Sequence, residues 1–327
     1  MIPRRPLLAT LAAMPCARAL AQGAAWPSRP ISWTVPFLAG GSADLLARLL
    51  ADRMAPRLGA QARIVVENRG GAGGAIGSEY VRRQPPDGHS LLLATPSTHA
   101  TVPATQPATT PYDAAADFTA IAILGQSPLI LAVPNASPHR DVRGLIESLR
   151  ARPGGASWGN SGAGGIGHLT GELMNVMAGG LQTEQVPYRG GSALVEALVK
   201  NELEYAWESM GSFTSALQDR QFRALAVSTK ARHPLFPDVP TMDESGLPGF
   251  ETSTWNALCG PRGMPGEVVS RLNAAANESL KEPTVIERLS VAGIDAVSDS
   301  TPATTAAFLA NELAKYRDVV ARANLRL

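Results

Sequence analysis

Strand-like and helix-like patterns alternate along this chain in two separate blocks, and the alternation narrows the possible folds more than any other feature. In the first block an apolar run at 31–35 precedes leucines at helical spacing over 45–58, and a second apolar run follows at 63–67. A strand, a helix and a strand in this order fit one right-handed crossover unit of a parallel sheet. The first block therefore predicts a doubly wound α/β sheet.

The second block repeats the alternation after a predicted helix at 141–151. Its predicted elements are strands at 156–158, 182–186, 203–207 and 223–227 and helices at 167–177 and 192–200. Between the blocks, the Thr/Pro/Ala-rich segment 95–117 predicts an ordered excursion over the surface. Beyond Lys230 the pattern is mainly helical, with a last helix at 302–322.

Neither block alone has room to bury the helices at the end of the chain, so we expect them to return to the first block. Domain 1 is then discontinuous, with residues 24–124 plus 230–327, and domain 2 comprises 125–229. The chain would cross between the two domains near Leu124 and near Ser228. Two crossing strands predict a hinge.

Residues 1–21 have the features of a secretory signal peptide: early arginines, a short apolar stretch and small residues up to Ala21. Cleavage near Ala21 predicts a periplasmic protein and would remove Cys16, while general secretion and twin-arginine export both remain open. Cys259 would then be the only thiol, which rules out a disulfide within the processed chain.

Charge and hydropathy exclude two classes of partner. The 29 basic and 28 acidic side chains nearly cancel, which argues against a nucleic-acid binder that relies on a basic field. No stretch reaches the roughly 18 uninterrupted apolar residues of a spanning helix, so the protein is not expected to be embedded in a membrane.

Two glycine-rich loops, at 36–44 and 159–168, each lie between a predicted strand and a predicted helix. Glycine lets the backbone approach a ligand closely, and the free N–H groups of the following helical turn favour an anion. In open α/β sheets, ligands sit at this carboxyl end of the strands. One such loop in each block predicts an anion-binding cleft between the domains, with plain tight turns as the alternative.

Enzyme motifs fit these loops poorly. Residues 162–167 satisfy the dinucleotide fingerprint, but the segment before them is a poor buried strand and Glu184 lies inside a strand instead of at its end. Residues 159–163 miss the nucleophile elbow of serine hydrolases at the last position. The five histidines are dispersed without metal-ligand spacing. We therefore expect no cofactor, no metal and no catalytic residues.

Short motifs along nearly the whole chain carry a family resemblance. They include Trp26-Pro27-Ser28-Arg29-Pro30, Val35-Pro36-Phe37 with Gly40-Gly41, Val66-Glu67-Asn68-Arg69, Pro86-Asp87-Gly88, Pro111-Tyr112-Asp113, His168-Leu169, Val186-Pro187-Tyr188, Pro237-Asp238-Val239-Pro240-Thr241 and Gly246-Leu247-Pro248-Gly249-Phe250. Together they resemble the Bug-type periplasmic substrate-binding receptors of tripartite tricarboxylate transporters.

The resemblance implies a two-domain periplasmic binding protein of the type II Venus flytrap architecture, which closes on a small carboxylate without catalysis. Its implied partners are membrane subunits of a tripartite tricarboxylate-type transporter; a ligand-binding sensory receptor that docks on a signalling protein, and an enzyme acting on a carboxylate, are the alternatives. The loop residues that would hold the carboxylate are Phe37, Ala39, Gly40, Gly41, Ser42, Asp44, Ser161, Gly162, Ala163, Gly164, Gly165 and His168.

Further candidate ligand residues each have a structural alternative. Thr95, Ser97, Thr98 and His99 resemble a cleft loop of the family but also suit turns and caps. Tyr188 would cover the cleft or pack in the domain, and Trp255 would be a pocket wall or a core aromatic. Asp44 suits the positive end of a helix better than an anion site, and His168 suits packing beside its loop.

The sequence departs from the family pattern at positions that shape the predicted pocket. Ala43 stands where the family usually has Thr, and Glu208 stands where it usually has Asp. Glu208 either orients a donor group of the ligand or is a solvated carboxylate. Because these changes alter the polar end of the pocket, no family member's ligand is assigned to this chain.

Overall fold

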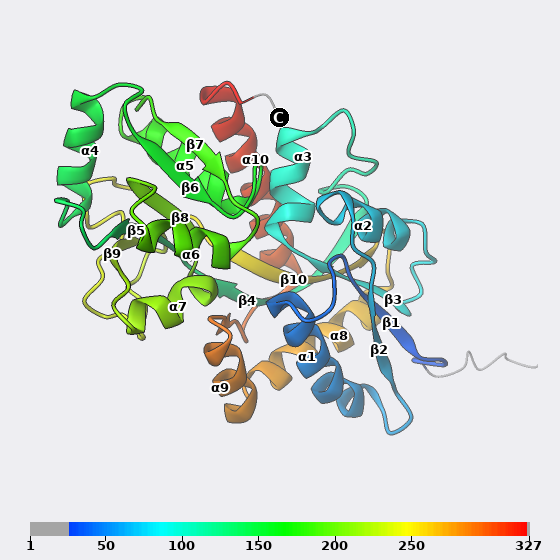
Figure 1. Cartoon of the computed structure of the whole chain (residues 1–327). Helices are drawn as coiled ribbons and strands as arrows, with labels where there is room; N and C mark the ends of the chain where they lie inside the picture. The colour runs from blue at the N-terminus through cyan, green and yellow to red at the C-terminus, as the bar shows by residue number, and fades with distance from the viewer. Residues whose placement is uncertain (1–25, 326–327) are drawn as a thin grey trace, which may run out of the picture.

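The computed structural model describes residues 26–325 and has two lobes, each built on one β-sheet flanked by helices (Figure 1). The strands are β1 (Ile31–Val35), β2 (Ile64–Asn68), β3 (Ser90–Ala94), β4 (Phe118–Ser127), β5 (Leu129–Pro134), β6 (Ser157–Asn160), β7 (Glu184–Pro187), β8 (Tyr205–Ser209), β9 (Phe222–Val227), β10 (Thr254–Pro261) and β11 (Asp295–Ala296). The helices are α1 (Ser42–Leu58), α2 (Ala75–Arg82), α3 (Val102–Thr105), α4 (Val142–Ala151), α5 (Ile166–Met177), α6 (Gly191–Val199), α7 (Met210–Gln218), α8 (Gly266–Leu280), α9 (Pro283–Val291) and α10 (Pro302–Arg322), with short turns η1 (Ala72–Gly74) and η2 (Ser97–Thr101). The predicted signal peptide lies outside the described residues.

Both sheets combine parallel and antiparallel neighbours. The first sheet has the order β11-β4-β10-β3-β1-β2, in which β2, β1 and β3 are parallel and β10 is antiparallel to β3 and β4. The second has the order β7-β6-β8-β5-β9, in which β7, β6 and β8 are parallel and β5 is antiparallel to β8 and β9. The predicted architecture of two α/β lobes is confirmed, including the β1-α1-β2 unit.

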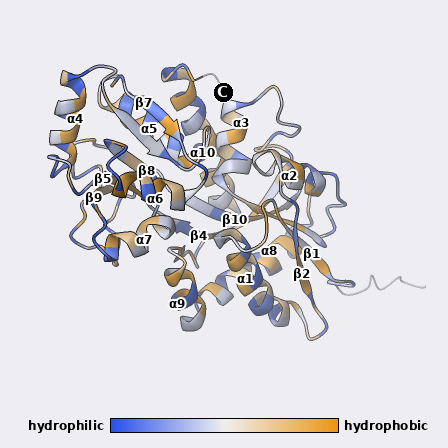
Figure 2. Ribbon diagram, in the orientation of Figure 1, coloured by the Kyte–Doolittle hydropathy of each residue, from blue (hydrophilic) through white to orange (hydrophobic). Residues whose placement is uncertain are grey.

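The flanking helices are amphipathic, so each buries one face on its sheet. Figure 2 shows hydrophobic and hydrophilic residues interleaved along them, for example in α4. In α4 the residues Val142, Leu145, Ile146 and Leu149 are buried at helical spacing, and Asp141 caps the helix by accepting the Gly144 N–H at 2.8 Å. Among the described residues, no helix combines the length and apolar character required to span a membrane.

The prediction that the chain is mainly helical after Lys230 is wrong for β10. This strand lies inside the first sheet between β3 and β4, and all its residues after Thr254 are buried. A strand covered on both faces shows no strict alternation of polar and apolar residues, so its pattern is easily missed. Helix α7 was also missed, because its glycine, serine and threonine residues have low helix propensity.

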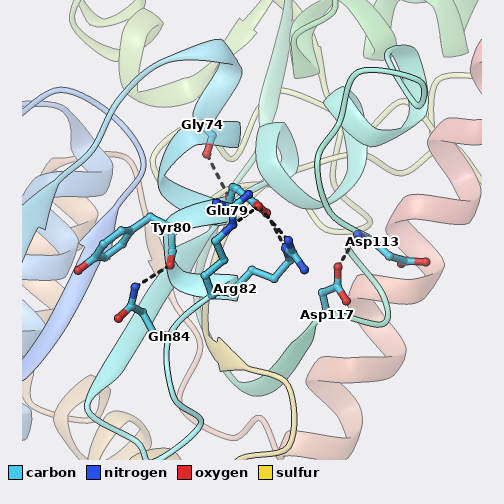
Figure 3. Close-up of polar contacts among 9 residues, drawn as sticks. Gly74, Glu79, Tyr80, Arg82, Gln84, Asp113 and Asp117 are labelled. Atoms are coloured by element: carbon cyan, nitrogen blue, oxygen red, sulfur yellow. Dashed lines mark hydrogen bonds and ion pairs between the residues drawn. The ribbon is translucent and has the colours of Figure 1, made fainter.

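The prediction of a surface excursion at 95–117 is wrong in part. η2 and α3 lie within it, and Thr98, His99 and Thr101 are buried. The Tyr112 hydroxyl donates to the Thr98 carbonyl at 2.7 Å, which ties the later part of the segment to η2. The segment passes beside α2, where Glu79 pairs with Arg82, and it ends in a turn closed by the Asp113 N–H on Asp117 (Figure 3).

The chain passes between the sheets twice, from β4 to β5 and from β9 back to β10. Ser228 joins the two passages: its hydroxyl donates to the Thr252 carbonyl at 2.7 Å and accepts the Leu129 N–H at 2.9 Å. Helix α10, red in Figure 1, contacts β4 and also α5 of the second lobe. These connections hold the lobes side by side.

Candidate functional site

A cavity of about 640 Å³ opens between the lobes and is lined by residues from both. Its volume is within the usual range of small-molecule pockets. Eight of the predicted ligand residues line it: Phe37, Gly40, Gly41, Ser42, Thr95, Ser97, Ser161 and Glu208. The two glycine-rich loops therefore face the same space.

The first turns of three helices meet at this cavity. Ser42 and Ala43 begin α1, Ile166 begins α5, and Gly211 and Ser212 lie in the first turn of α7. The first N–H groups of a helix have no partner within the helix, and the helix dipole places partial positive charge there. Of the described residues that line the cavity, none is Lys, Arg or His. Attraction for an anion must therefore come from helix ends and hydroxyl groups.

Asp44 holds the first turn of α1 in place. Its carboxylate accepts the Gly40 N–H at 3.0 Å, the Asn68 amide at 2.9 Å and the Arg48 guanidinium at 3.1 Å. The hydrogen bond from Arg48 is the largest cause that lowers the pKa of Asp44 to about 2. Asp44 is buried and is not among the cavity-lining residues. It acts on the loop that carries Gly40 and Gly41.

We expect Asp44→Asn to lower the free energy of unfolding by about 1 kcal/mol at pH 7, a value reduced because solvent screens the half-exposed Arg48. The folded pKa lies below the ordinary 3.8, so the stabilisation is present above that pH and is lost as the pH falls toward 2. Urea unfolding at pH 7, 5 and 3 measures the difference. Asp52→Asn, an exposed change on the same helix, is the control; a deficit in Asp44→Asn that stays constant with pH would contradict the ion-pair explanation.

Several backbone N–H groups of the second glycine-rich loop form hydrogen bonds within the loop itself. The Gly162 N–H donates to Asn160 Oδ1 at 2.9 Å, the Gly164 N–H to His168 Nδ1 at 2.9 Å, and the Gly165 N–H to the Gly162 carbonyl at 3.3 Å. These three amides, predicted as ligand donors, are therefore occupied within the loop. The three glycines, Ala163 and His168 all lie outside the cavity lining. His168 is buried and packs against Trp158.

The predicted group after β3 divides between the cavity and the core. Thr95 and Ser97 line the cavity. Thr98 and His99 face inward: Thr98 Oγ1 accepts the Thr95 N–H at 3.0 Å and lies 3.0 Å from His99 Nδ1. Burial lowers the pKa of His99 to about 3, so its ring is neutral near pH 7.

Trp255 faces away from the cavity. It is fully buried, and its indole N–H donates to Glu312 of α10 at 2.9 Å. Because neighbouring strand residues point to opposite faces, Thr254 and Asn256 line the cavity instead. Tyr188 packs partly buried against the second-lobe core and Ala39 is exposed, and neither lines the cavity. Whether any predicted residue contacts a ligand stays a prediction.

Several polar lining residues were not predicted. They are Ser127, Ser209, Ser212, Thr254 and Asn256. Ser209 directly precedes α7, and a serine before a helix is a recognisable N-cap signal. Thr254 and Asn256 belong to β10, whose residues after Thr254 are all buried, so no alternation of polar and apolar residues along the whole strand marks them in the sequence.

The described residues contain no group of three or more His, Cys, Asp or Glu side chains placed to hold a metal ion. The Cys259 thiol is free and buried in β10, and burial raises its pKa to about 12. A thiol of this kind is chemically inert near pH 7.

Comparison with known proteins adds a family match over residues 46–325, to a model described as "Tripartite tricarboxylate transporter family receptor". A protein of Pseudomonas sp. (strain P51), described as "UPF0065 protein in tcbD-tcbE intergenic region", is 37% identical over 98% of this chain and 94% of its own length. The protein BugT of Bordetella pertussis is 32% identical over 92% of this chain and 91% of its own length.

Two similar solved structures contain a carboxylate. One is "R. palustris Rpa4515 with adipate", which is 32% identical with a TM-score of 0.77 over 92% of this chain and 99% of that one. The other is "MatC (Rpa3494) from Rhodopseudomonas palustris with bound malate", 30% identical with a TM-score of 0.74 over 90% of this chain and 100% of that one.

Proposed function

This chain belongs to the tripartite tricarboxylate transporter receptor family, and from that premise we propose that its interlobe cavity captures a small carboxylate for delivery to membrane transporter subunits. The predicted class, a solute-binding receptor and not an enzyme, agrees with the family and with its solved members. We further propose that the protein is exported to the periplasm after cleavage near Ala21.

One observation carries the assignment of the site: the first turns of α1, α5 and α7 meet at a single cavity. A carboxylate there gains charge-assisted hydrogen bonds from free amides and from hydroxyls such as Ser42 and Ser161, without a basic side chain. The carboxylates bound by the two R. palustris relatives support this class of ligand.

In this proposal the lobes close on the ligand about the two passages of the chain between the sheets. The domain boundaries suggested by the sequence, near Leu124 and Lys230, lie close to the two passages between the sheets that Ser228 joins. A ligand that contacts both lobes favours the closed form by its difference in affinity for the closed and open forms.

A thermal-shift screen of mono-, di- and tricarboxylates tests the function, on protein that has been unfolded and refolded to remove any ligand. A carboxylate at 100 times its dissociation constant stabilises the fold by about 2.7 kcal/mol and raises Tm by a few degrees. Gly41→Val should abolish the shift but keep the Tm of the free protein, since a Cβ at Gly41 meets nothing within 4 Å.

Gly266→Ala is the matched control, because a Cβ at this first residue of α8 also meets open space but lies outside the cavity lining. It should keep the full ligand-induced shift. No response to any carboxylate in the unsubstituted protein would reject the proposed function, and an unchanged response in Gly41→Val would move the site away from α1.

A further inference from the structure

Glu208 is the one ionisable side chain among the described residues that line the cavity. It lies near the end of β8 and is 5% exposed. Oε1 accepts two hydrogen bonds from Ser209, one from the backbone N–H and one from the hydroxyl, both at 2.8 Å. Oε2 is buried and has no hydrogen-bond partner among the described residues.

An unpartnered carboxylate oxygen is costly inside a protein, because burial removes water without replacing its hydrogen bonds. The local fold does not supply the missing donor. Gly191, at the start of α6, lies close enough for a Cβ to come within 3.9 Å of Glu208 Cδ, yet no backbone N–H of that turn bonds Oε2.

Charge balance restricts the ligand further. A carboxylate held at the helix ends would bring a second negative charge into a cavity whose described lining contains no Lys, Arg or His. A ligand with only carboxylates and methylenes would leave Oε2 unpaired and would repel it. A ligand that also carries an N–H or O–H donor supplies the hydrogen bond that Oε2 lacks, and an ammonium group also offsets the added negative charge.

We propose that the cavity selects carboxylates that also carry a hydrogen-bond donor, an ammonium or a hydroxyl group, and that Glu208 is the acceptor that makes the selection. This inference rests on the proposed function and names its substrate class. The carboxylate of the ligand lies at the first turns of α1 and α5, and its donor group lies at Oε2.

Matched ligands of one carbon skeleton test the selection. Succinate, malate and aspartate differ only in a hydrogen, a hydroxyl or an ammonium group at one carbon, and glutarate, 2-hydroxyglutarate and glutamate repeat the series one methylene longer. Calorimetric titration of the refolded full chain should give at least roughly tenfold tighter binding for a donor-bearing member than for its unsubstituted parent, as expected for a hydrogen bond to a charged group.

Glu208→Gln removes the charge but retains the shape of the side chain. It should reduce that preference about tenfold and should leave the affinity for the unsubstituted diacid unchanged or higher. If Glu208→Gln loses more affinity for the ammonium ligand than for the hydroxyl ligand, the ammonium is the natural donor, and the reverse result identifies the hydroxyl.

Glu202→Gln, an exposed change just before β8, should leave all the affinities unchanged. Circular dichroism shows whether each variant folds, and Glu208→Asp, which keeps the carboxylate, should retain the preference.

The role of Glu208 and the function as a carboxylate receptor are contradicted by different results. Tight binding of succinate or glutarate without preference, or a preference that survives in Glu208→Gln, overturns the role of Glu208 but leaves a carboxylate receptor. Absence of binding for every acid, including unsubstituted ones, overturns both.

Discussion

Replacing Gly293 with alanine should weaken carboxylate binding about 30- to 100-fold without unfolding the protein. Gly293 lies between α9 and β11 of the first lobe, with its backbone against that of Gly211 in α7 of the second lobe. A Cβ at Gly293 would lie 2.7 Å from Gly211 Cα and 2.8 Å from its nitrogen. Backbone atoms cannot yield to a clash as a flexible side chain does, so the lobes must move apart here, at a cost of about 2 to 3 kcal/mol to any arrangement of the lobes that keeps this contact. Gly293 is not among the cavity-lining residues but Gly211 is, so the loss would come from moving the first turn of α7 away from the first lobe and not from removal of a contact between Gly293 and the ligand.

Gly249→Ala controls for backbone strain. Gly249 has φ +79° and Gly293 has φ +72°, so both substitutions place alanine in the left-handed region, but a Cβ at Gly249 meets nothing within 4 Å. Each variant should lose about 1 kcal/mol of folding stability, and only Gly293→Ala should lose affinity. Titration calorimetry gives the affinities, and small-angle scattering with ligand present gives the separation of the lobes. Equal affinities in the two variants would show that closure does not depend on this contact.

Trp255→Ala should produce the largest loss of stability, about 4 kcal/mol, with a fall in Tm of roughly 10 °C. The indole is fully buried between β10 and α10, in a core with Ala257, Leu309 and Tyr316. Its removal leaves a cavity and takes a donor from Glu312, which is itself buried and keeps only its contact with Lys315. Urea unfolding followed by circular dichroism measures the change.

One further variant separates the hydrogen bond of Trp255 from its packing, and a second, at an exposed residue, is the control. Trp255→Phe retains most of the ring but not the N–H, so it should cost about 1 to 2 kcal/mol. Leu38→Ala removes a side chain that is 81% exposed and should change stability by less than about 0.5 kcal/mol. If Trp255→Ala proved as mild as Leu38→Ala, the packing of α10 on β10 would contribute little to the fold.

The elements that the sequence predicted well have strong local signals. The helix predicted at 302–322 matches α10, which begins with Pro302 after a Thr301 cap whose side chain accepts the Thr304 N–H at 3.1 Å. β10 has no such signal, because both of its faces are covered, and its pairing with β3 and β4 brings together segments more than 100 residues apart along the chain. Periodicity reports the environment of a segment and not its partners.

The candidate site shows the same limit. Glycine spacing located both loops that face the cavity, because glycine marks places where the backbone needs unusual freedom. It did not reveal that the amides of Gly162 and Gly164 are bonded to Asn160 and His168. Which donor remains free depends on the folded geometry of the loop, and the residue types alone do not determine it.

The late position of β10 in the chain has a consequence for the order of folding during synthesis. A ribosome releases β3 and β4 long before β10, the strand that separates them in the finished sheet. Until residue 261 has emerged, two strands of the first lobe have no neighbour on the side that β10 will fill. The nascent polypeptide therefore completes its first lobe only after the whole second lobe has been translated.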